Sequence, residues 1–219
     1  MASVTDRRFS GLRADRVTEN LDRVRERIAA AGGDPVGVEV CAAVKYVALE
    51  ELPVLAEAGI TVVGENRAQD LVAAQERHGR ELFTWDFIGA LQSRKVRDVA
   101  PRVRLIHSVA SESALRRLES DPAPEVLVEV NVAAEEGKAG VAVDELGDFI
   151  ERCPSPVTGL MTMPPLAREA EDSRPHFARL AELAGAHGLE RLSMGTTQDF
   201  EVAVQEGATI VRLGTVLYE

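Results

Sequence analysis

The sequence predicts an α/β protein folded as a single (β/α)8 barrel domain over residues 1–219. Two observations indicate this fold. Short runs rich in β-branched residues recur eight times, and each gap between them has the periodicity of a helix. Several runs are almost unbroken apolar segments, which is typical of parallel strands buried on both faces. An open doubly wound sheet is the competing architecture, but the strand count favours closure, and no glycine-rich dinucleotide motif follows the first strand.

The first predicted element is an extra N-terminal helix over residues 12–31, ahead of the repeating pattern. Its apolar residues recur at spacings of four, three and four: Val17, Leu21, Val24 and Ile28. This spacing places one apolar stripe on an otherwise charged helix. The pair of glycines that follows is expected to end the helix.

The eight predicted strands then follow in order along the chain. They cover residues 38–45, 61–66, 85–91, 104–110, 125–132, 157–163, 191–195 and 209–214. The segments between them each suit a helix, over residues 49–59, 68–79, 92–100, 111–120, 143–153, 175–188 and 198–207. Strands that alternate with helices in this way predict a parallel sheet covered by helices.

Composition excludes several classes of protein. The chain is 45% apolar and 28% charged, and it has no apolar run long enough to cross a membrane. Its first residues are charged where a signal peptide is apolar, so we expect a cytoplasmic location. A formal charge of −11 argues against nucleic-acid binding. The two cysteines, Cys41 and Cys153, lie far apart in the sequence and predict no metal site.

The segments SMGTT and RLGT are the clearest signal of a ligand site. They follow the seventh and eighth predicted strands, where (β/α)8 barrels often bind phosphate. Hydroxyl groups are available from Ser193, Thr196, Thr197 and Thr215. Gly195 and Gly214 would let the backbone come close to a phosphate. We therefore predict an anion site at these two loops.

Lys45 stands at the end of the first predicted strand. By itself it could be the first solvated residue after a strand. Beside a phosphate site, however, an amine held among apolar neighbours is a candidate nucleophile toward an aldehyde. A phosphorylated aldehyde bound as a Schiff base fits both features, and pyridoxal 5'-phosphate is the commonest such cofactor. A sugar-phosphate aldolase could use the same groups, and composition and spacing do not separate the two.

Eight segments in order give the chain a resemblance to a known family. They are AAVKYV, VGENRAQDL, WDFIGALQSRK, IHSVAS, VNVAAEEGKAG, GLMTMP, LSMGTTQDFEVAV and ATIVRLGTVLY. Together they resemble the pyridoxal phosphate homeostasis proteins, which are related to the N-terminal barrel domain of alanine racemase. The resemblance covers nearly the whole chain, and it implies a barrel of that type.

The resemblance also implies which residues bind pyridoxal 5'-phosphate. The predicted cofactor-binding set, with two positions added from the loop pattern, is Lys45, Asn66, Ser193, Gly195, Thr196, Thr197, Arg212, Gly214 and Thr215. Within it, Lys45 is implied to form the Schiff base and Arg212 to lie beside the cofactor. An arginine that faces the pyridine nitrogen would weaken the ring as an electron sink, and we hypothesise this role for Arg212.

The chain departs from the family's usual sequence at several positions, including Thr196-Thr197 and Asp86. The family more often has Met-Ser where this chain has Thr196 and Thr197, so one phosphate hydroxyl is expected from threonine. Asp86 stands where a histidine is common. We expect cofactor binding to survive both changes.

The expected activity is limited because racemisation needs a base on each face of the substrate carbon. In racemases the second base is a tyrosine that depends on an additional C-terminal domain, whereas this sequence ends at Glu219. Tyr46 and Tyr218 are interpreted as packing residues. His107 is either a base or, more in keeping with its strand, a hydrogen-bonded histidine beneath the cofactor. No residue is therefore assigned as catalytic.

The resulting hypothesis is a pyridoxal 5'-phosphate carrier that takes part in intracellular vitamin B6 and amino-acid homeostasis without substantial catalysis. Its expected partners are pyridoxal-phosphate-dependent apoenzymes that receive the cofactor, with no nucleic acid or membrane. We expect a monomer, since the domain that builds the racemase dimer is missing from this sequence. A small pyridoxal-phosphate-dependent racemase and a cofactor-free Schiff-base aldolase are the alternatives.

Overall fold

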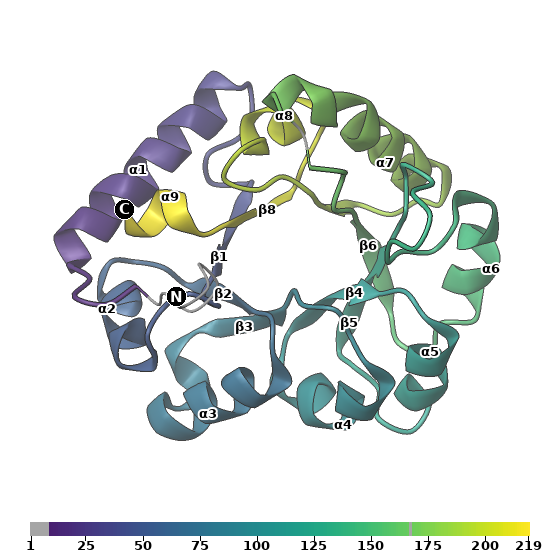
Figure 1. The fold of residues 1–219 in the computed structure, drawn as a ribbon, viewed down its shortest axis with the longest axis horizontal. Coiled ribbons are helices and arrows are strands. Elements are labelled where there is room, and N and C mark those ends of the chain that lie inside the picture. Colours follow the sequence, from purple (N-terminus) through teal and green to yellow (C-terminus); the bar gives the residue numbers. More distant parts are fainter. Residues whose placement is uncertain (1–8, 167) are drawn as a thin grey trace.

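A computed structural model describes residues 9–166 and 168–219. Eight parallel strands pair in sequence order, and the first also pairs with the last, so the sheet closes into a barrel. Figure 1 looks into this barrel, with the strands around the centre and the helices in an outer ring. The predicted (β/α)8 architecture is confirmed.

Strands and helices alternate along the described chain. The strands are β1 (Glu39–Ala43), β2 (Val62–Glu65), β3 (Thr84–Phe87), β4 (Leu105–Val109), β5 (Glu125–Glu129), β6 (Val157–Met161), β7 (Arg191–Ser193) and β8 (Ile210–Leu213). The α-helices are α1 (Ala14–Ala30), α2 (Leu52–Glu57), α3 (Ala68–His78), α4 (Val96–Val99), α5 (Glu112–Leu118), α6 (Leu146–Glu151), α7 (Arg174–Ala186), α8 (Phe200–Gln205) and α9 (Thr215–Tyr218). Short 3-10 helices cover Leu49–Glu51, Arg80–Leu82, Ser93–Lys95, Ala100–Arg102, Val143–Glu145 and Ala170–Ser173.

Helix α1 confirms the predicted N-terminal helix, and its apolar stripe is buried as expected. It lies beside α9, at the other end of the chain (Figure 1). Asn20 of α1 joins the two helices by donating hydrogen bonds to the carbonyl oxygens of Leu217 and Glu219, at 3.1 and 2.8 Å. Helix α9 was not predicted, because four residues after the last strand are too few to show a helical period.

The strands are shorter than the apolar runs that predicted them. Strand β1 ends at Ala43, and Lys45 therefore lies in the following turn rather than on the strand. Strand β7 spans only three residues. These differences matter for the site, because the predicted functional residues fall on the loops that leave the strands.

Side chains fill the barrel interior. An apolar cluster inside it consists of Cys41, Val62, Leu105, Leu127, Met161 and Ile210. Near the N-terminal ends of the strands, Arg104 pairs with Glu39 at 2.6 Å and Arg191 pairs with Glu125 at 2.5 Å. The interior is thus a packed core with charged pairs at one end, as expected for a barrel of this size.

In residues 9–166 and 168–219, no helix has the length and apolar character needed to cross a membrane. In the same residues, no group of three or more His, Cys, Asp or Glu side chains is placed to hold a metal ion.

Candidate functional site

A pocket of about 470 Å³ lies at the C-terminal ends of the strands. A cavity of this size suits a small-molecule ligand. Seven of the nine predicted site residues line it: Lys45, Asn66, Thr196, Thr197, Arg212, Gly214 and Thr215. These residues come from both ends of the chain, and barrel closure between β1 and β8 brings them together.

Lys45 is exposed to this pocket from the turn after β1. Its Nζ atom lies 4.6 Å from the centre of the Tyr46 ring, a cation–π distance. The sequence predicted an amine held among apolar neighbours at the strand end, whereas Lys45 is exposed because the strand ends two residues earlier. Tyr46 also lines the pocket, so its interpretation as a packing residue alone was wrong.

Asn66 is held at the pocket by the residue before it. The buried Glu65 carboxylate accepts hydrogen bonds from the backbone N–H groups of Asn66, at 2.7 Å, and Arg67, at 3.3 Å. These bonds fix the backbone between β2 and α3. Glu65 therefore holds the backbone on which Asn66 reaches the pocket.

The two Gly-Thr loops meet at the pocket. The backbone N–H of Gly214 donates to Oγ1 of Thr197 at 3.4 Å, which links the loop after β8 to the loop after β7. The N–H and Oγ1 of Thr196 both donate to Asp199 Oδ1, at 2.7 and 3.0 Å. Gly195 does not line the pocket, but its φ of +88° sets the direction of the first loop.

Arg212 forms the polar floor of the pocket, and Ser193 holds it from below. Arg212 Nη1 donates to the carbonyl oxygen and to Oγ of Ser193, both at 2.7 Å. Its Nη2 donates to the carbonyl oxygen of Thr162 at 3.0 Å and contacts Met163 Sδ at 2.8 Å. Burial lowers the pKa of the Arg212 guanidinium. Ser193 is fully buried and is not part of the lining, so it reaches the pocket only through Arg212.

Within the described part of the chain, the hydrogen bonds of Arg212 come from Nη1 and Nη2, and none comes from Nε. This leaves one donor of a buried arginine available to a ligand. A ring nitrogen with a free lone pair is a suitable acceptor for such a group.

Glu129, at the end of β5, lines the pocket and was not selected from the sequence. Burial raises the pKa of its carboxyl group, and the charges of Arg212 and Lys138 oppose that effect. The sequence did contain a signal that Glu129 points inward. In an alternating strand it is on the same face as Leu127, which belongs to the barrel interior.

His107 is fully buried beneath the pocket and does not line it. Its ring nitrogens lie 2.8 Å from Ser193 Oγ and 3.1 Å from Asp86 Oδ2. The structure therefore places His107 as a hydrogen-bonded histidine of the barrel interior.

Comparisons with known proteins agree with this fold. The family described as "Alanine racemase, N-terminal domain" matches residues 12–219. The pyridoxal phosphate homeostasis protein of Aquifex aeolicus is 37% identical over 93% of this chain and 96% of its own length. The structure of PipY from Synechococcus elongatus with PLP bound has a TM-score of 0.79, at 29% identity over 93% of this chain and all of PipY.

Alanine racemase from Corynebacterium glutamicum shares the fold, with a TM-score of 0.72 and 18% identity over 94% of this chain and 61% of the racemase. The fold and the family match thus define a barrel of the alanine racemase N-terminal class. Within this class, the chain belongs to the family of pyridoxal phosphate homeostasis proteins.

Proposed function

We propose that this protein binds pyridoxal 5'-phosphate as a Schiff base with Lys45 and takes part in vitamin B6 and amino-acid homeostasis. The proposal rests chiefly on one observation: a lysine amine, a buried arginine and two Gly-Thr loops line the same pocket. The relationship to PipY, whose structure contains PLP, supports it.

The groups in the pocket fit the chemistry of this cofactor. The phosphate would lie at the paired loops, where Thr197, Gly214 and Thr215 offer hydroxyl and backbone groups. The free Nε–H of Arg212 would face the pyridine nitrogen, and Asn66 would contact the ring. Lys45 would supply the amine. When bound, the cofactor supplies a reactive aldehyde and a ring that can withdraw electrons.

Ser193 and Gly195 would contribute from outside the lining, Ser193 by holding Arg212 and Gly195 by shaping the phosphate loop. Thr196, which lines the pocket, would also shape this loop through its two hydrogen bonds to Asp199. In this proposal these three residues support the cofactor-binding groups.

We infer that the whole chain acts as a single-domain, monomeric cofactor carrier in the cytoplasm. Pyridoxal-phosphate-dependent apoenzymes would be its recipients. An arginine donor at the pyridine nitrogen would leave that nitrogen without its proton and weaken electron withdrawal, which supports a carrier with little catalysis of its own.

The sequence offers a direct test, because its only lysines are Lys45, Lys95 and Lys138. The purified protein is mixed with pyridoxal 5'-phosphate, its visible absorption is recorded, and the link is reduced with borohydride. Mass spectrometry of peptides should then find the modification on Lys45.

Lys45→Ala should abolish both the absorption band and the modified peptide, whereas the control Lys95→Ala should retain both. Modification at Lys95 or Lys138 instead of Lys45 would contradict the proposal. Turnover of an amino-acid enantiomer at ordinary enzyme rates, about 1 s⁻¹ or more, would contradict the carrier role.

A further inference from the structure

A chain of buried hydrogen bonds leads from the pocket floor into the barrel. It begins at Arg212, whose Nη1 contacts Ser193 Oγ at 2.7 Å, and continues from Ser193 Oγ to His107 Nδ1 at 2.8 Å. His107 Nε2 then lies 3.1 Å from Oδ2 of Asp86. Asp86, His107 and Ser193 are fully buried, so water does not compete for these bonds.

The chemistry of the two end groups fixes which atom donates in each of these hydrogen bonds. The guanidinium of Arg212 can only donate, and an ionised Asp86 carboxylate can only accept. His107 Nε2–H therefore donates a hydrogen bond to Asp86. In the neutral ring Nδ1 is then an acceptor, and it accepts a hydrogen bond from the Ser193 hydroxyl. The Ser193 oxygen in turn accepts from Arg212. Burial lowers the pKa of His107, which agrees with a neutral ring.

Asp86 is itself anchored from the opposite end of the barrel. Arg104 donates from Nε to Asp86 Oδ1 at 3.1 Å and from Nη2 to Oδ2 at 2.6 Å. The same guanidinium donates two hydrogen bonds to Glu39, at 2.6 and 2.7 Å. Asp86 is thus held in place by an arginine that a second carboxylate fixes.

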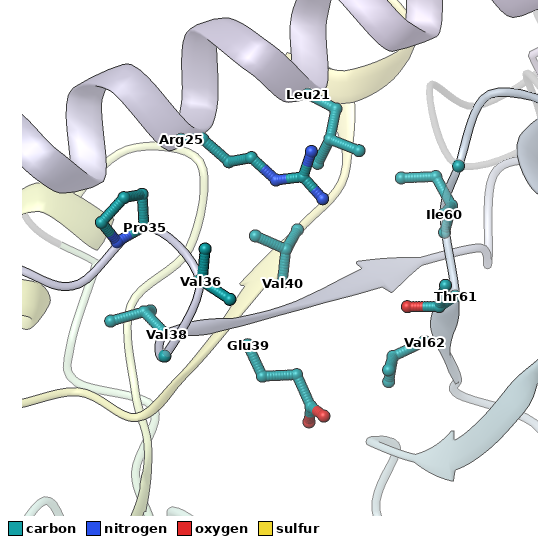
Figure 2. Close-up of a pocket in the computed structure, with 12 residues that line it drawn as sticks. Leu21, Arg25, Pro35, Val36, Val38, Glu39, Val40, Ile60, Thr61 and Val62 are labelled. Atoms are coloured by element: carbon teal, nitrogen blue, oxygen red, sulfur yellow. The ribbon is translucent and has the colours of Figure 1, made fainter.

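Glu39 lines a second cavity of about 630 Å³, which lies between α1 and the starts of β1 and β2. Figure 2 shows this cavity, with the Glu39 side chain pointing away from Arg25 on α1. Through Arg104, the lining of this cavity is joined to the barrel interior. The series of hydrogen bonds therefore runs from one end of the barrel to the other, and Arg212 is its last member at the pocket.

We propose that His107 is a positioning residue, which holds the Arg212 guanidinium in place through Ser193, and that Asp86 keeps His107 in the tautomer this requires. With its Nη groups fixed in this way, Arg212 presents Nε–H to a ligand. The effect on the cofactor rests on the proposed function, whereas the tautomer is a property of the protein alone.

The first test uses the wild-type protein without cofactor. Long-range ¹H–¹⁵N NMR spectra distinguish the two tautomers of a histidine ring. We expect His107 to carry its proton on Nε2 at neutral pH. A proton on Nδ1, or on both nitrogens, would overturn the proposal. This result does not depend on whether pyridoxal 5'-phosphate binds or on whether any variant folds.

The second test is a double-mutant cycle read out by spectrophotometric titration with pyridoxal 5'-phosphate. His107→Leu should weaken binding about tenfold, because a hydrogen bond that orients a charged group is lost. In an Arg212→Gln background the same change should alter binding less than about twofold, because His107 acts through Arg212. Independent, multiplicative effects would overturn the proposal.

The control is His187→Gln, at the exposed end of α7, which should leave the affinity unchanged. If wild-type protein fails to bind the cofactor, the proposed function fails, and the NMR result still decides the role of His107.

Discussion

Arg212 donates from a single nitrogen, Nη1, to both the carbonyl oxygen and the hydroxyl of Ser193, each at 2.7 Å. This pair connects β8 to β7 directly below the pocket. A planar guanidinium can make such a double contact and still bind the Thr162 carbonyl with its other nitrogen, whereas a lysine ammonium cannot span these acceptors.

Arg212→Lys should therefore weaken pyridoxal 5'-phosphate binding about tenfold or more, although the charge is conserved. The absorption spectrum of bound cofactor should also change if Arg212 faces the ring nitrogen as proposed, because its donor is then displaced. Titration followed by absorbance measures both effects. Arg94→Lys, an exposed substitution, is the control. An unchanged affinity and spectrum would rule out a specific role for the guanidinium.

Gly195→Ala should destabilise the protein by about 2 kcal/mol. The backbone there has φ of +88°, and an added Cβ would lie 2.6 Å from the Cβ of Ala203 and 2.9 Å from the Cα of Phe200. Urea unfolding measures the loss. Gly185→Ala is a matched control, because that glycine is in α7 with no atom near its added Cβ. The control should be stabilising by about 0.5–1 kcal/mol. Equal effects at the two positions would contradict the steric argument.

Arg104→Leu should destabilise the protein by roughly 3 kcal/mol, because it removes the arginine that pairs with a fully buried Asp86. The exposed pair of Arg16 and Glu19 gives a comparison, and Arg16→Leu should cost less than about 1 kcal/mol. Chemical denaturation of both variants measures the difference. If Arg104→Leu is as mild as Arg16→Leu, the Asp86 anchor has no energetic importance.

We expect Glu129 to make the free energy of unfolding depend on pH. Burial raises the pKa of its carboxyl in the folded protein above the ordinary value of 4.5. The folded state then holds this proton more tightly than the unfolded state. The contribution of Glu129 to stability is therefore lost as pH rises from 4.5 through its raised pKa.

Glu129→Gln removes this contribution. The unfolding free energy of the variant relative to wild type should therefore increase with pH over that window and level off above it. Denaturation at a series of pH values measures the difference, with the exposed Glu190→Gln as control. A relative stability that falls as pH rises would show the opposite shift of the Glu129 pKa.

Local patterns in the sequence were sufficient to predict the architecture, and together with the family resemblance they predicted seven of the residues that line the pocket. The stripe of α1 follows from one helical period, and the strands follow from short β-branched runs. Lys45 and the loop residues Thr197 and Thr215 were found because parallel strands bring their C-terminal ends to one face.

The tertiary structure alone decided the partners of buried polar groups. His107 and Ser193 are 86 positions apart in the sequence, and barrel closure and strand register bring them together. The pairing of Arg104 with Asp86 and the inward direction of Glu129 depend on register in the same way. Sequence patterns indicate which residues are buried, because buried positions repeat with the period of the local helix or strand. The hydrogen-bond partner of a buried polar group is decided only when distant strands meet.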